Sequence, residues 1–335
     1  MLHVKIFRRR RALSLALIAT LGGGLLAGCQ QAAQQETPVK VGYSAWPGWF
    51  PWKVTEEKGL FDKAGVPVSM QWFDGYLDSI NALSAGQLDC NSQTLNDTIS
   101  SVAGGADLQV VLTNDQSTGN DQIIVAEGIT SIADLKGKKV AVEEGTVDHY
   151  LLLLVLEKGG LTVDDVQFVP LETGAAAAAF AAGKVDAAGV YAPFTTQALK
   201  RPGSKALFTS KDFPGAITDH LVCRTEFVAQ NPEKVQKIVD AWFATLKTMK
   251  DDPASTLPIL VERSGVSEPE FKEYAAGTTI FTLEENRQAF KDGDTMLSLP
   301  FAAGKISDFL VDSKLIQKAP DLSNLLPSQF VDNAR

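Results

Sequence analysis

The chain has 335 residues, of which 45% are hydrophobic and 21% are charged, as in an ordinary folded globular protein. Its formal net charge of −9 at pH 7 includes a basic N-terminal segment, so the rest of the chain is more acidic still. This charge argues against nucleic acid or anionic lipid as a partner, because both repel an acidic surface.

Residues 1–28 predict an export signal rather than part of the fold. Basic residues precede an apolar core, residues 12–26, that is too short to span a membrane comfortably. Leu26-Ala27-Gly28-Cys29 resembles a bacterial lipobox, which implies cleavage before Cys29 and a lipid anchor on it. An ordinary secretory signal with a chance Cys is the alternative. Residues 29–38 then read as the lipidated Cys and a polar tether on the periplasmic or cell-surface side of the membrane.

Removal of the signal leaves 335 − 28 = 307 residues, enough for two lobes of ordinary size. An aromatic turn at residues 44–52 follows the first predicted strand and carries Trp46, Trp49 and Trp52, broken by two Pro and one Gly. Flat side chains on a stiff turn at the C-terminal end of a strand form a good wall for a small ligand. The alternative is a loop whose Trp side chains only cover the core.

Strands and helices alternate along the chain, which predicts an α/β fold with mainly parallel sheets and helices on their faces. The predicted strands span residues 39–43, 66–73, 88–92, 108–113, 122–126, 140–142, 166–170, 185–191, 206–208 and 220–224. The clearest predicted helices span residues 51–58, 76–85, 147–158, 174–182 and 233–250. From there to residue 310 the chain reads as helices that complete the first lobe, without a sheet of their own.

A short internal echo links two of these strands. Residues 83–89 and 180–186 both end a helix in Ala-Gly, continue with one polar residue and start a strand with an apolar-Asp pair. Each strand then leads to a turn, at residues 93–98 and at residues 191–194. Two similar lobes would direct these turns, including Tyr191, into a common cleft, although one echo of this length also arises by chance.

In order and spacing, these features resemble the solute-binding proteins of nitrate/sulfonate/taurine-type ABC importers. The resemblance also rests on the stretches at residues 57–61 and 134–142, and on Gly145-Thr146 before a Leu-rich helix. It implies a two-lobe, periplasmic-binding-protein-like fold of type II with two hinge crossovers, near residues 114–121 and 212–219. Lobe 1 would hold residues 39–116 plus 220–335, and lobe 2 residues 117–219. The same superfamily includes proteins similar to a thiamine-pyrimidine synthase, whose Cys-rich motif this chain lacks.

The resemblance implies a binding protein without catalysis, cofactor or metal. Such a protein captures a small-molecule solute and delivers it to an ABC permease and its ATPase. It would be a monomer, held at the membrane through its lipid anchor, and it would bind no nucleic acid. The sequence does not decide whether the same binding module serves a sensor instead of an importer, or whether the anchor lies in the inner or the outer membrane.

Catalytic signatures are absent from the sequence. It has no Gly-x-Ser-x-Gly elbow, no His-Glu-x-x-His and no Cys-x-x-Cys, and its three His supply little for a metal or acid/base site. An exported enzyme that uses paired carboxylates, as glycosidases do, is the less favoured alternative because the carboxylates lie in scattered turns. Cys90 and Cys223 could form a disulfide or stay as two buried thiols.

The turns at the predicted strand ends are rich in acids and poor in bases. Nitrate or a sulfonate needs exposed N–H groups at helix N-termini together with Arg or Lys. An acidic, Trp-lined cleft suits a small planar or alkylammonium cation instead, because carboxylates neutralise the charge and rings offer cation–π faces. We therefore predict a nitrogen-rich cation such as guanidine, with nitrate, sulfonate, taurine or bicarbonate as alternatives.

Ten residues are predicted to form the ligand site. The alternative for each Asp is a helix cap or turn residue on a solvated rim. Asp115 is a further acidic candidate, and His149 is expected on the helix surface or behind the site. The predicted site residues are Trp46, Trp49, Trp52, Asp74, Asp97, Asp121, Glu144, Thr146, Tyr191 and Asp219.

Overall fold

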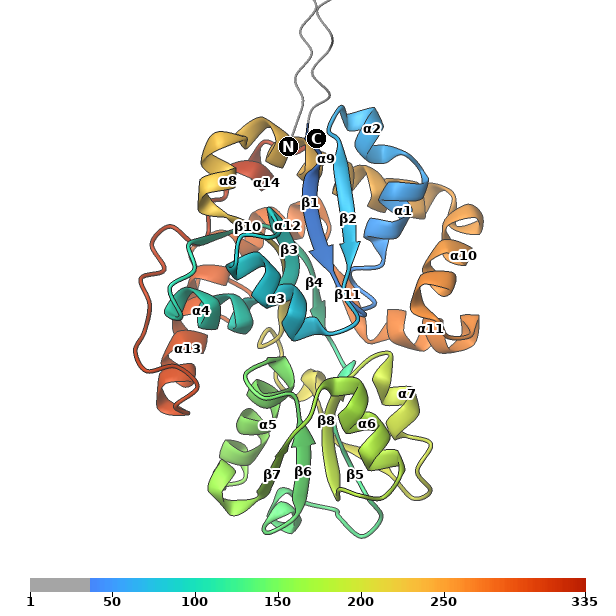
Figure 1. Ribbon diagram of the computed structural model, residues 1–335, viewed down its shortest axis with the longest axis vertical. Helices are drawn as coiled ribbons and strands as arrows, with labels where there is room; N and C mark the ends of the chain where they lie inside the picture. Colours follow the sequence, from blue (N-terminus) through green and yellow to red (C-terminus); the bar gives the residue numbers. More distant parts are fainter. Residues whose placement is uncertain (1–36) are drawn as a thin grey trace, which may run out of the picture. The chain divides into compact units, whose positions relative to one another are not determined.

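The structure, a computed structural model, describes residues 37–335. The predicted export signal at residues 1–28, Cys29 and most of the predicted tether lie outside these residues. Within residues 37–335, none of the helices is both long enough and apolar enough to cross a bilayer. Two sheets with helices packed on them confirm the expected α/β class (Figure 1).

The first sheet has six strands in the order β11-β4-β10-β3-β1-β2. β1 pairs in parallel with β2 and β3, β10 runs antiparallel to β3 and β4, and β11 runs antiparallel to β4. Its strands are β1 (Val39–Tyr43), β2 (Val68–Trp72), β3 (Cys90–Thr94), β4 (Leu108–Ser117), β10 (Thr218–Arg224) and β11 (Thr278–Ile280).

The second sheet has five strands in the order β7-β6-β8-β5-β9. β6 pairs in parallel with β7 and β8, whereas β5 runs antiparallel to β8 and β9. Its strands are β5 (Asp121–Val125), β6 (Lys139–Val142), β7 (Gln167–Pro170), β8 (Ala187–Tyr191) and β9 (Lys205–Thr209).

Both sheets are mixed, so the prediction of mainly parallel sheets is wrong. The reason lies in the two connections between the sheets, β4 to β5 and β9 to β10. β5 and β10 are each the first strand that the chain forms after it crosses from the other sheet, so each starts at the junction and runs away from it. Their neighbours β8 and β3 run toward the junction, which makes these pairs antiparallel (Figure 1).

The second sheet is covered on both faces because successive side chains of a strand point to opposite sides. Ile123 packs in the cluster that includes the buried side of α5, whereas Ile124 packs with Phe180 of α6. Alanines at 176, 177 and 188 let α6 lie close to the sheet. The helices of this part are α5 (Val147–Lys158), α6 (Thr173–Ala181) and α7 (Phe194–Ala198), with single 3₁₀ turns η1 (Ile132–Leu135), η2 (Val163–Asp165) and η3 (Ser210–Asp212).

Helices from both ends of the chain cover the first sheet. The longest, α9, begins at Pro232, one residue before the predicted range, since proline fits the first helical position. Its Trp242 packs against Trp52 with ring centroids 4.5 Å apart. The helices of this part are α1 (Pro51–Glu57), α2 (Leu60–Ala64), α3 (Tyr76–Ser84), α4 (Leu95–Ala103), α8 (Thr225–Gln230), α9 (Pro232–Asp251), α10 (Pro253–Ser264), α11 (Glu268–Ala276), α12 (Leu283–Ala289), α13 (Leu299–Asp312) and α14 (Gln329–Asp332).

The C-terminal part also supplies a strand that the sequence reading missed. β11 is only three residues long and pairs with the end of β4 at the edge of the first sheet. The expectation that this region adds only helices is therefore wrong. We call the first sheet with its helices lobe 1, and the second sheet with its helices lobe 2; the exact boundaries at 116/117 and 219/220 stay a prediction.

A disulfide joins Cys90 and Cys223, the two cysteines whose state the sequence left open. The two residues are direct partners in the antiparallel pair of β3 and β10, and both are buried. The bridge closes a loop of 133 residues that contains all of lobe 2. It therefore ties the strand that returns from lobe 2 to the centre of lobe 1.

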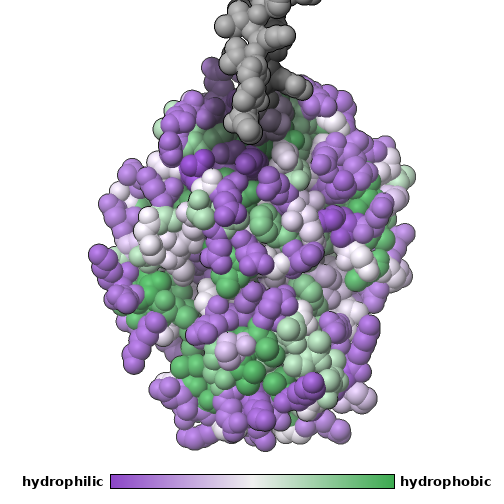
Figure 2. Space-filling view, viewed as in Figure 1, coloured by the Kyte–Doolittle hydropathy of each residue, from purple (hydrophilic) through white to green (hydrophobic). Residues whose placement is uncertain are grey.

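On the face shown in Figure 2, hydrophilic residues predominate, and a broader apolar area lies in the lower half of the view. Among residues 37–335, the large apolar side chains with high exposure are Leu199 and Leu297. The Trp side chains of the turn at 44–52 are all buried. The aromatic groups that could bind a ligand are thus found inside the protein, at the junction of the lobes.

Candidate functional site

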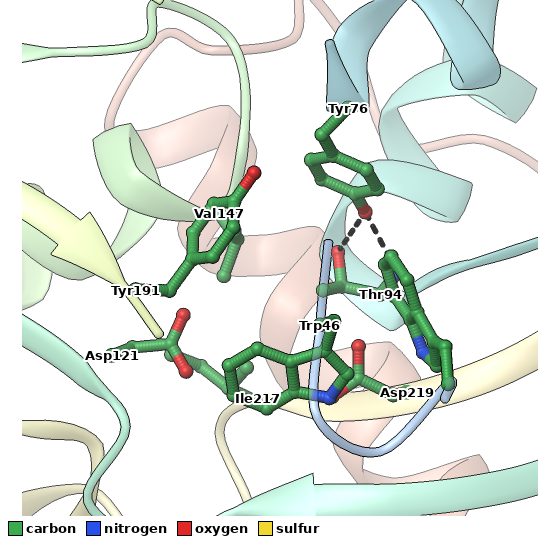
Figure 3. Close-up of a pocket in the computed structure, with 9 residues that line it drawn as sticks. Trp46, Tyr76, Thr94, Asp121, Val147, Tyr191, Ile217 and Asp219 are labelled. Atoms are coloured by element: carbon green, nitrogen blue, oxygen red, sulfur yellow. Dashed lines mark hydrogen bonds between the residues drawn. The ribbon is translucent and has the colours of Figure 1, made fainter. Parts of the chain in front are cut away.

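A small cavity lies where the two lobes and the two crossovers meet (Figure 3). Lobe 1 contributes the turn after β1, the start of α3 and the end of β3, whereas lobe 2 contributes the start of α5 and the end of β8. The crossovers contribute the start of β5 and the start of β10. The lining residues are Trp46, Trp49, Tyr76, Thr94, Asp121, Val147, Tyr191, Ile217 and Asp219.

The cavity is narrow. Its volume is about 10 Å³, which is about enough for one water molecule. A solute that binds here must therefore be small, and the lining side chains must move apart to admit it.

Four aromatic rings form a closed cage around the cavity. Trp46 contacts Trp49 and Tyr191, with ring centroids 6.5 Å and 6.1 Å apart. Tyr76 completes the cage, because its ring lies 5.5 Å from that of Trp49 and 6.3 Å from that of Tyr191. The four rings thus enclose one small volume, and an aromatic ring attracts a cation that lies over its face.

Buried carboxyl groups lie beside this cage. Asp115 accepts a hydrogen bond from the indole N–H of Trp46 at 2.9 Å, and it faces Asp219 across the β4–β10 pair. Asp121 starts β5 and lines the cavity directly. One carboxyl oxygen of each of these three Asp residues is buried without a hydrogen-bond partner. A buried carboxylate left in this state is costly, so each group is poised to accept a donor from a ligand.

Burial raises the pKa of these acids. The pKa of Asp115 and that of Asp121 are each raised to about 7, mainly by desolvation. Desolvation and the nearby charge of Asp115 raise the pKa of Asp219 still further. Because two buried carboxyl groups this close cannot both ionise easily, the Asp115–Asp219 pair titrates as a unit and holds a proton more readily than an isolated carboxyl group.

Asp97 lies in the first turn of α4 and bridges the lobes. Its carboxylate accepts hydrogen bonds from the Thr94 hydroxyl at 2.8 Å and from the Asn96 amide at 2.7 Å. It also accepts from the backbone N–H of Val147, the first residue of α5 in lobe 2. Desolvation raises the pKa of Asp97 to about 7 in spite of these bonds. The N-terminus of α5 thus already has a carboxylate in the place where an anionic ligand would bind.

A second group of acids lies behind Tyr191. The hydroxyl of Thr173 donates to Asp148 at 2.6 Å and lies 3.2 Å from an oxygen of Glu143. Desolvation raises the pKa of Glu143 to about 7 and that of Asp148 well above its usual value. Burial thus favours the neutral form of Asp148, whose carboxyl group accepts the Thr173 hydroxyl.

Basic groups do not offset these acids at the cavity. The nine lining residues, all within residues 37–335, include no Lys, Arg or His. His220 lies next to Asp219, but it bonds to Thr113 and Thr218 and burial lowers its pKa to about 3, so it is neutral. In the same part of the chain, no three His, Cys, Asp or Glu residues are placed to hold a metal ion. The lining of the cavity thus carries carboxyl groups and no basic side chain.

The structure brings five of the ten predicted site residues to the cavity lining. They are Trp46, Trp49, Asp121, Tyr191 and Asp219. Asp97 and Thr146 lie just behind the lining: Thr146 precedes Val147, and its hydroxyl donates to the Glu143 carbonyl at 3.0 Å. Their role in binding stays a prediction.

Three predicted residues lie elsewhere. Trp52 points into the core of lobe 1, where its indole N–H donates to Ser92 at 3.0 Å. Asp74 is exposed and accepts from the indole of Trp72 at 2.7 Å. Glu144 is also exposed, whereas its neighbour Glu143 points inward. His149, expected at a helix surface or behind the site, is buried near Phe168, and burial lowers its pKa to about 4.

Sequence reasoning missed four of the lining residues. Tyr76 starts a predicted helix and Thr94 lies in a predicted turn, each shortly after a strand. That position was the signal that could have identified both residues as site candidates. Val147 and Ile217 gave no signal, because an apolar residue at a helix start or in a turn does not stand out among core residues.

Known proteins share this architecture. The family model described as NMT1/THI5 like matches residues 46–256. A binding protein from Brucella abortus (strain 2308) is 31% identical over 300 residues, which are 85% of this chain and 88% of that relative. The taurine-binding periplasmic protein of Escherichia coli (strain K12) is 28% identical over 246 residues, or 70% of this chain and 76% of the relative.

The crystal structure of the periplasmic aliphatic sulphonate binding protein from Escherichia coli has the same fold. It matches with a TM-score of 0.71 at 23% identity, covering 88% of this chain and 99% of that chain. This likeness confirms the two-lobe, periplasmic-binding-protein-like fold.

Proposed function

The chain belongs to the NMT1/THI5-like family, and from this premise we propose that it is an extracytoplasmic solute-binding protein that captures a small, nitrogen-rich cation such as guanidinium. The solute would be held between the lobes and delivered to an ABC permease with its ATPase. Cys29 would carry the lipid anchor, and the protein would act as a monomer without catalysis.

One observation carries the choice of a cation. Asp115, Asp121 and Asp219 each keep a buried carboxyl oxygen without a partner beside a cage of four aromatic rings. A planar cation with several N–H donors would satisfy these oxygens, and its faces would stack on the rings. Because the lining residues include no basic group, an anion at the same position would be repelled.

A small oxyanion is the second candidate, because the names of relatives include taurine and aliphatic sulfonate binding. Such an anion needs free N–H groups at a helix N-terminus and a basic partner. The Val147 N–H at the start of α5 already donates to Asp97. The residues of this chain therefore favour the cation.

Calorimetric titration of the purified protein tests the choice. Guanidinium chloride at low, non-denaturing concentration, methylguanidine and urea form one panel, and nitrate, taurine, bicarbonate and an alkanesulfonate form the other. We expect saturable binding of guanidinium and none of the anions. Urea is the matched neutral control, since it has a similar flat shape without the charge. Binding of an anion alone would show that the buried acids only stabilise the fold.

A further inference from the structure

The cavity is nearly closed off from solvent, because each of its nine lining residues is at most 5% exposed. A solute that fills it has no channel through which a long substituent could extend. The shape of the walls therefore limits the solute as strongly as their charge does. Two of the lining residues, Val147 and Ile217, are aliphatic; in Figure 3 Val147 lies near Tyr191 and Ile217 near Trp46.

Both aliphatic walls are held rigidly. Val147 is the first residue of α5, and its backbone N–H donates to Asp97. The carbonyl of Ile217 accepts from the backbone N–H of Ser117 at 3.0 Å. Both side chains are β-branched and have one strongly preferred rotamer in a given backbone setting. Moving the backbone of either wall would therefore distort a crossover or the start of a helix.

Resting on the proposed function, we infer that Val147 and Ile217 set the upper size limit of the solute, so that the site takes unsubstituted guanidinium and rejects N-alkylated guanidines. An alkyl group has two unfavourable positions. If the alkyl group faces an acid, it replaces one N–H donor of guanidinium, and a buried carboxyl oxygen is left unpaired. Facing away from the acids, it meets Val147 or Ile217 in a cavity without spare volume.

The test compares the dissociation constants of guanidinium, methylguanidine and ethylguanidine by calorimetry. We expect the wild-type protein to prefer guanidinium over methylguanidine by about tenfold or more, the usual effect of one carbon in a tight pocket. Ile217→Val and Ile217→Ala should reduce this ratio in steps to about threefold or less, mainly by improving methylguanidine binding. Val147→Ala should act in the same direction.

Ile238→Ala is the matched control, because Ile238 is fully buried on α9 and does not line the cavity. It should lower thermal stability without changing the ratio. Ile217→Val keeps a β-branched side chain, so it serves if Ile217→Ala does not fold.

Two different failures can be told apart. If the wild-type protein binds guanidinium and methylguanidine equally, or if the Ile217 and Val147 variants keep the wild-type ratio, the size limit is wrong while the cation function stands. If the wild-type protein binds no guanidine at all, the proposed function fails and the size limit with it.

Discussion

Asp115 on β4 and Asp219 on β10 are register partners in an antiparallel pair, and each keeps a buried carboxyl oxygen without a hydrogen-bond partner. Burial raises the pKa of both groups, and the nearby charge of Asp115 raises the pKa of Asp219 further, because two buried carboxylates this close repel each other. A cation that binds beside this pair would offset the repulsion and favour the ionised form of both groups.

Asp219→Asn separates the binding role of this pair from its structural role. The Asn amide is neutral and can donate to the unpartnered oxygen of Asp115, so we expect the ligand-free protein to be about 1 kcal/mol more stable in urea unfolding. Guanidinium binding should weaken by about 2–5 kcal/mol, because a buried charge partner is lost. Asp74→Asn, at an exposed predicted site residue, is the control and should leave affinity unchanged. Equal affinity in Asp219→Asn would remove this residue from the site.

Guanidinium affinity should rise with pH. The cation requires ionised carboxylates, and in the empty site the pKa of Asp97 and of Asp121 is raised to about 7. Below pH 7 each proton released on binding weakens the affinity by about tenfold per pH unit. Titrations at pH 5.5 and 8 in buffers of different ionisation enthalpy measure both the affinity and the number of protons. An affinity that is constant over this range would contradict the prediction.

The stability of the ligand-free protein should change in the opposite direction. A carboxyl group whose pKa is raised by folding stabilises the native state at low pH, and this contribution is lost as pH rises through the native pKa. The pKa values of six buried acids are raised in this way, namely Asp97, Asp115, Asp121, Glu143, Asp148 and Asp219.

Two buried histidines oppose this trend, because a lowered pKa makes stability rise with pH up to the unfolded value of 6.5. The pKa of His149 is lowered to about 4 and that of His220 to about 3. Six acids outweigh two histidines, so we expect the melting temperature of the ligand-free protein to fall between pH 5 and 8. Differential scanning calorimetry across this range, with and without guanidinium, measures the effect. A melting temperature that rises with pH in the ligand-free protein would contradict it.

Loss of the Cys90–Cys223 bridge should lower stability without changing the site. The double variant Cys90→Ala with Cys223→Ala should unfold about 2–5 kcal/mol more easily, the usual cost of losing a native disulfide. Neither cysteine lines the cavity, so the affinity of the folded protein should be unchanged. Urea unfolding and calorimetric titration provide the two measurements. A large loss of affinity at full folding would show that the bridge positions the site.

Tyr274→Phe should weaken solute binding modestly by favouring an open arrangement of the lobes. The Tyr274 hydroxyl, on α11 beside lobe 1, donates to the carbonyl of Pro193 in lobe 2 at 3.2 Å and bonds to Thr196. Each such hydrogen bond contributes about 0.5–1.5 kcal/mol. Tyr150→Phe is the control, because its ring contact with Phe309 is retained. Solution scattering should show a more open ligand-free Tyr274→Phe, and unchanged scattering with unchanged affinity would exclude this role.

The sequence was sufficient for elements whose ends carry local signals. α5 spans Val147–Lys158 as predicted, because Gly145-Thr146 precedes it and two glycines follow. α9 begins at Pro232, where proline fixes the backbone of the first turn. The direction of β5 and β10 could not be predicted in this way, since it depends on pairing between segments far apart in the chain, from 187 − 125 = 62 residues for β5 and β8 to 223 − 90 = 133 residues for β10 and β3.

The site was predictable to the extent that acids and Trp residues gather after strands. The sequence could not predict which side of a turn each residue faces, because a shift of one position along the chain reverses the direction of the side chain. Glu143 points inward and Glu144 outward for this reason, and Trp52 joins the core while Trp46 and Trp49 line the cavity. Burial of the Asp residues, which excludes the solvated-rim alternative for Asp97, Asp121 and Asp219, also required the three-dimensional arrangement.

The enclosed cavity has a consequence for the rates of exchange. A solute cannot enter or leave while its nine walls are in contact, so both steps wait for the lobes to separate. The dissociation rate of a solute bound in the closed state would then equal the rate at which the lobes open. Solutes of different affinity would therefore dissociate at the same rate. The association rate would level off at high solute concentration if the ligand-free protein is mostly closed, because opening rather than diffusion would limit it.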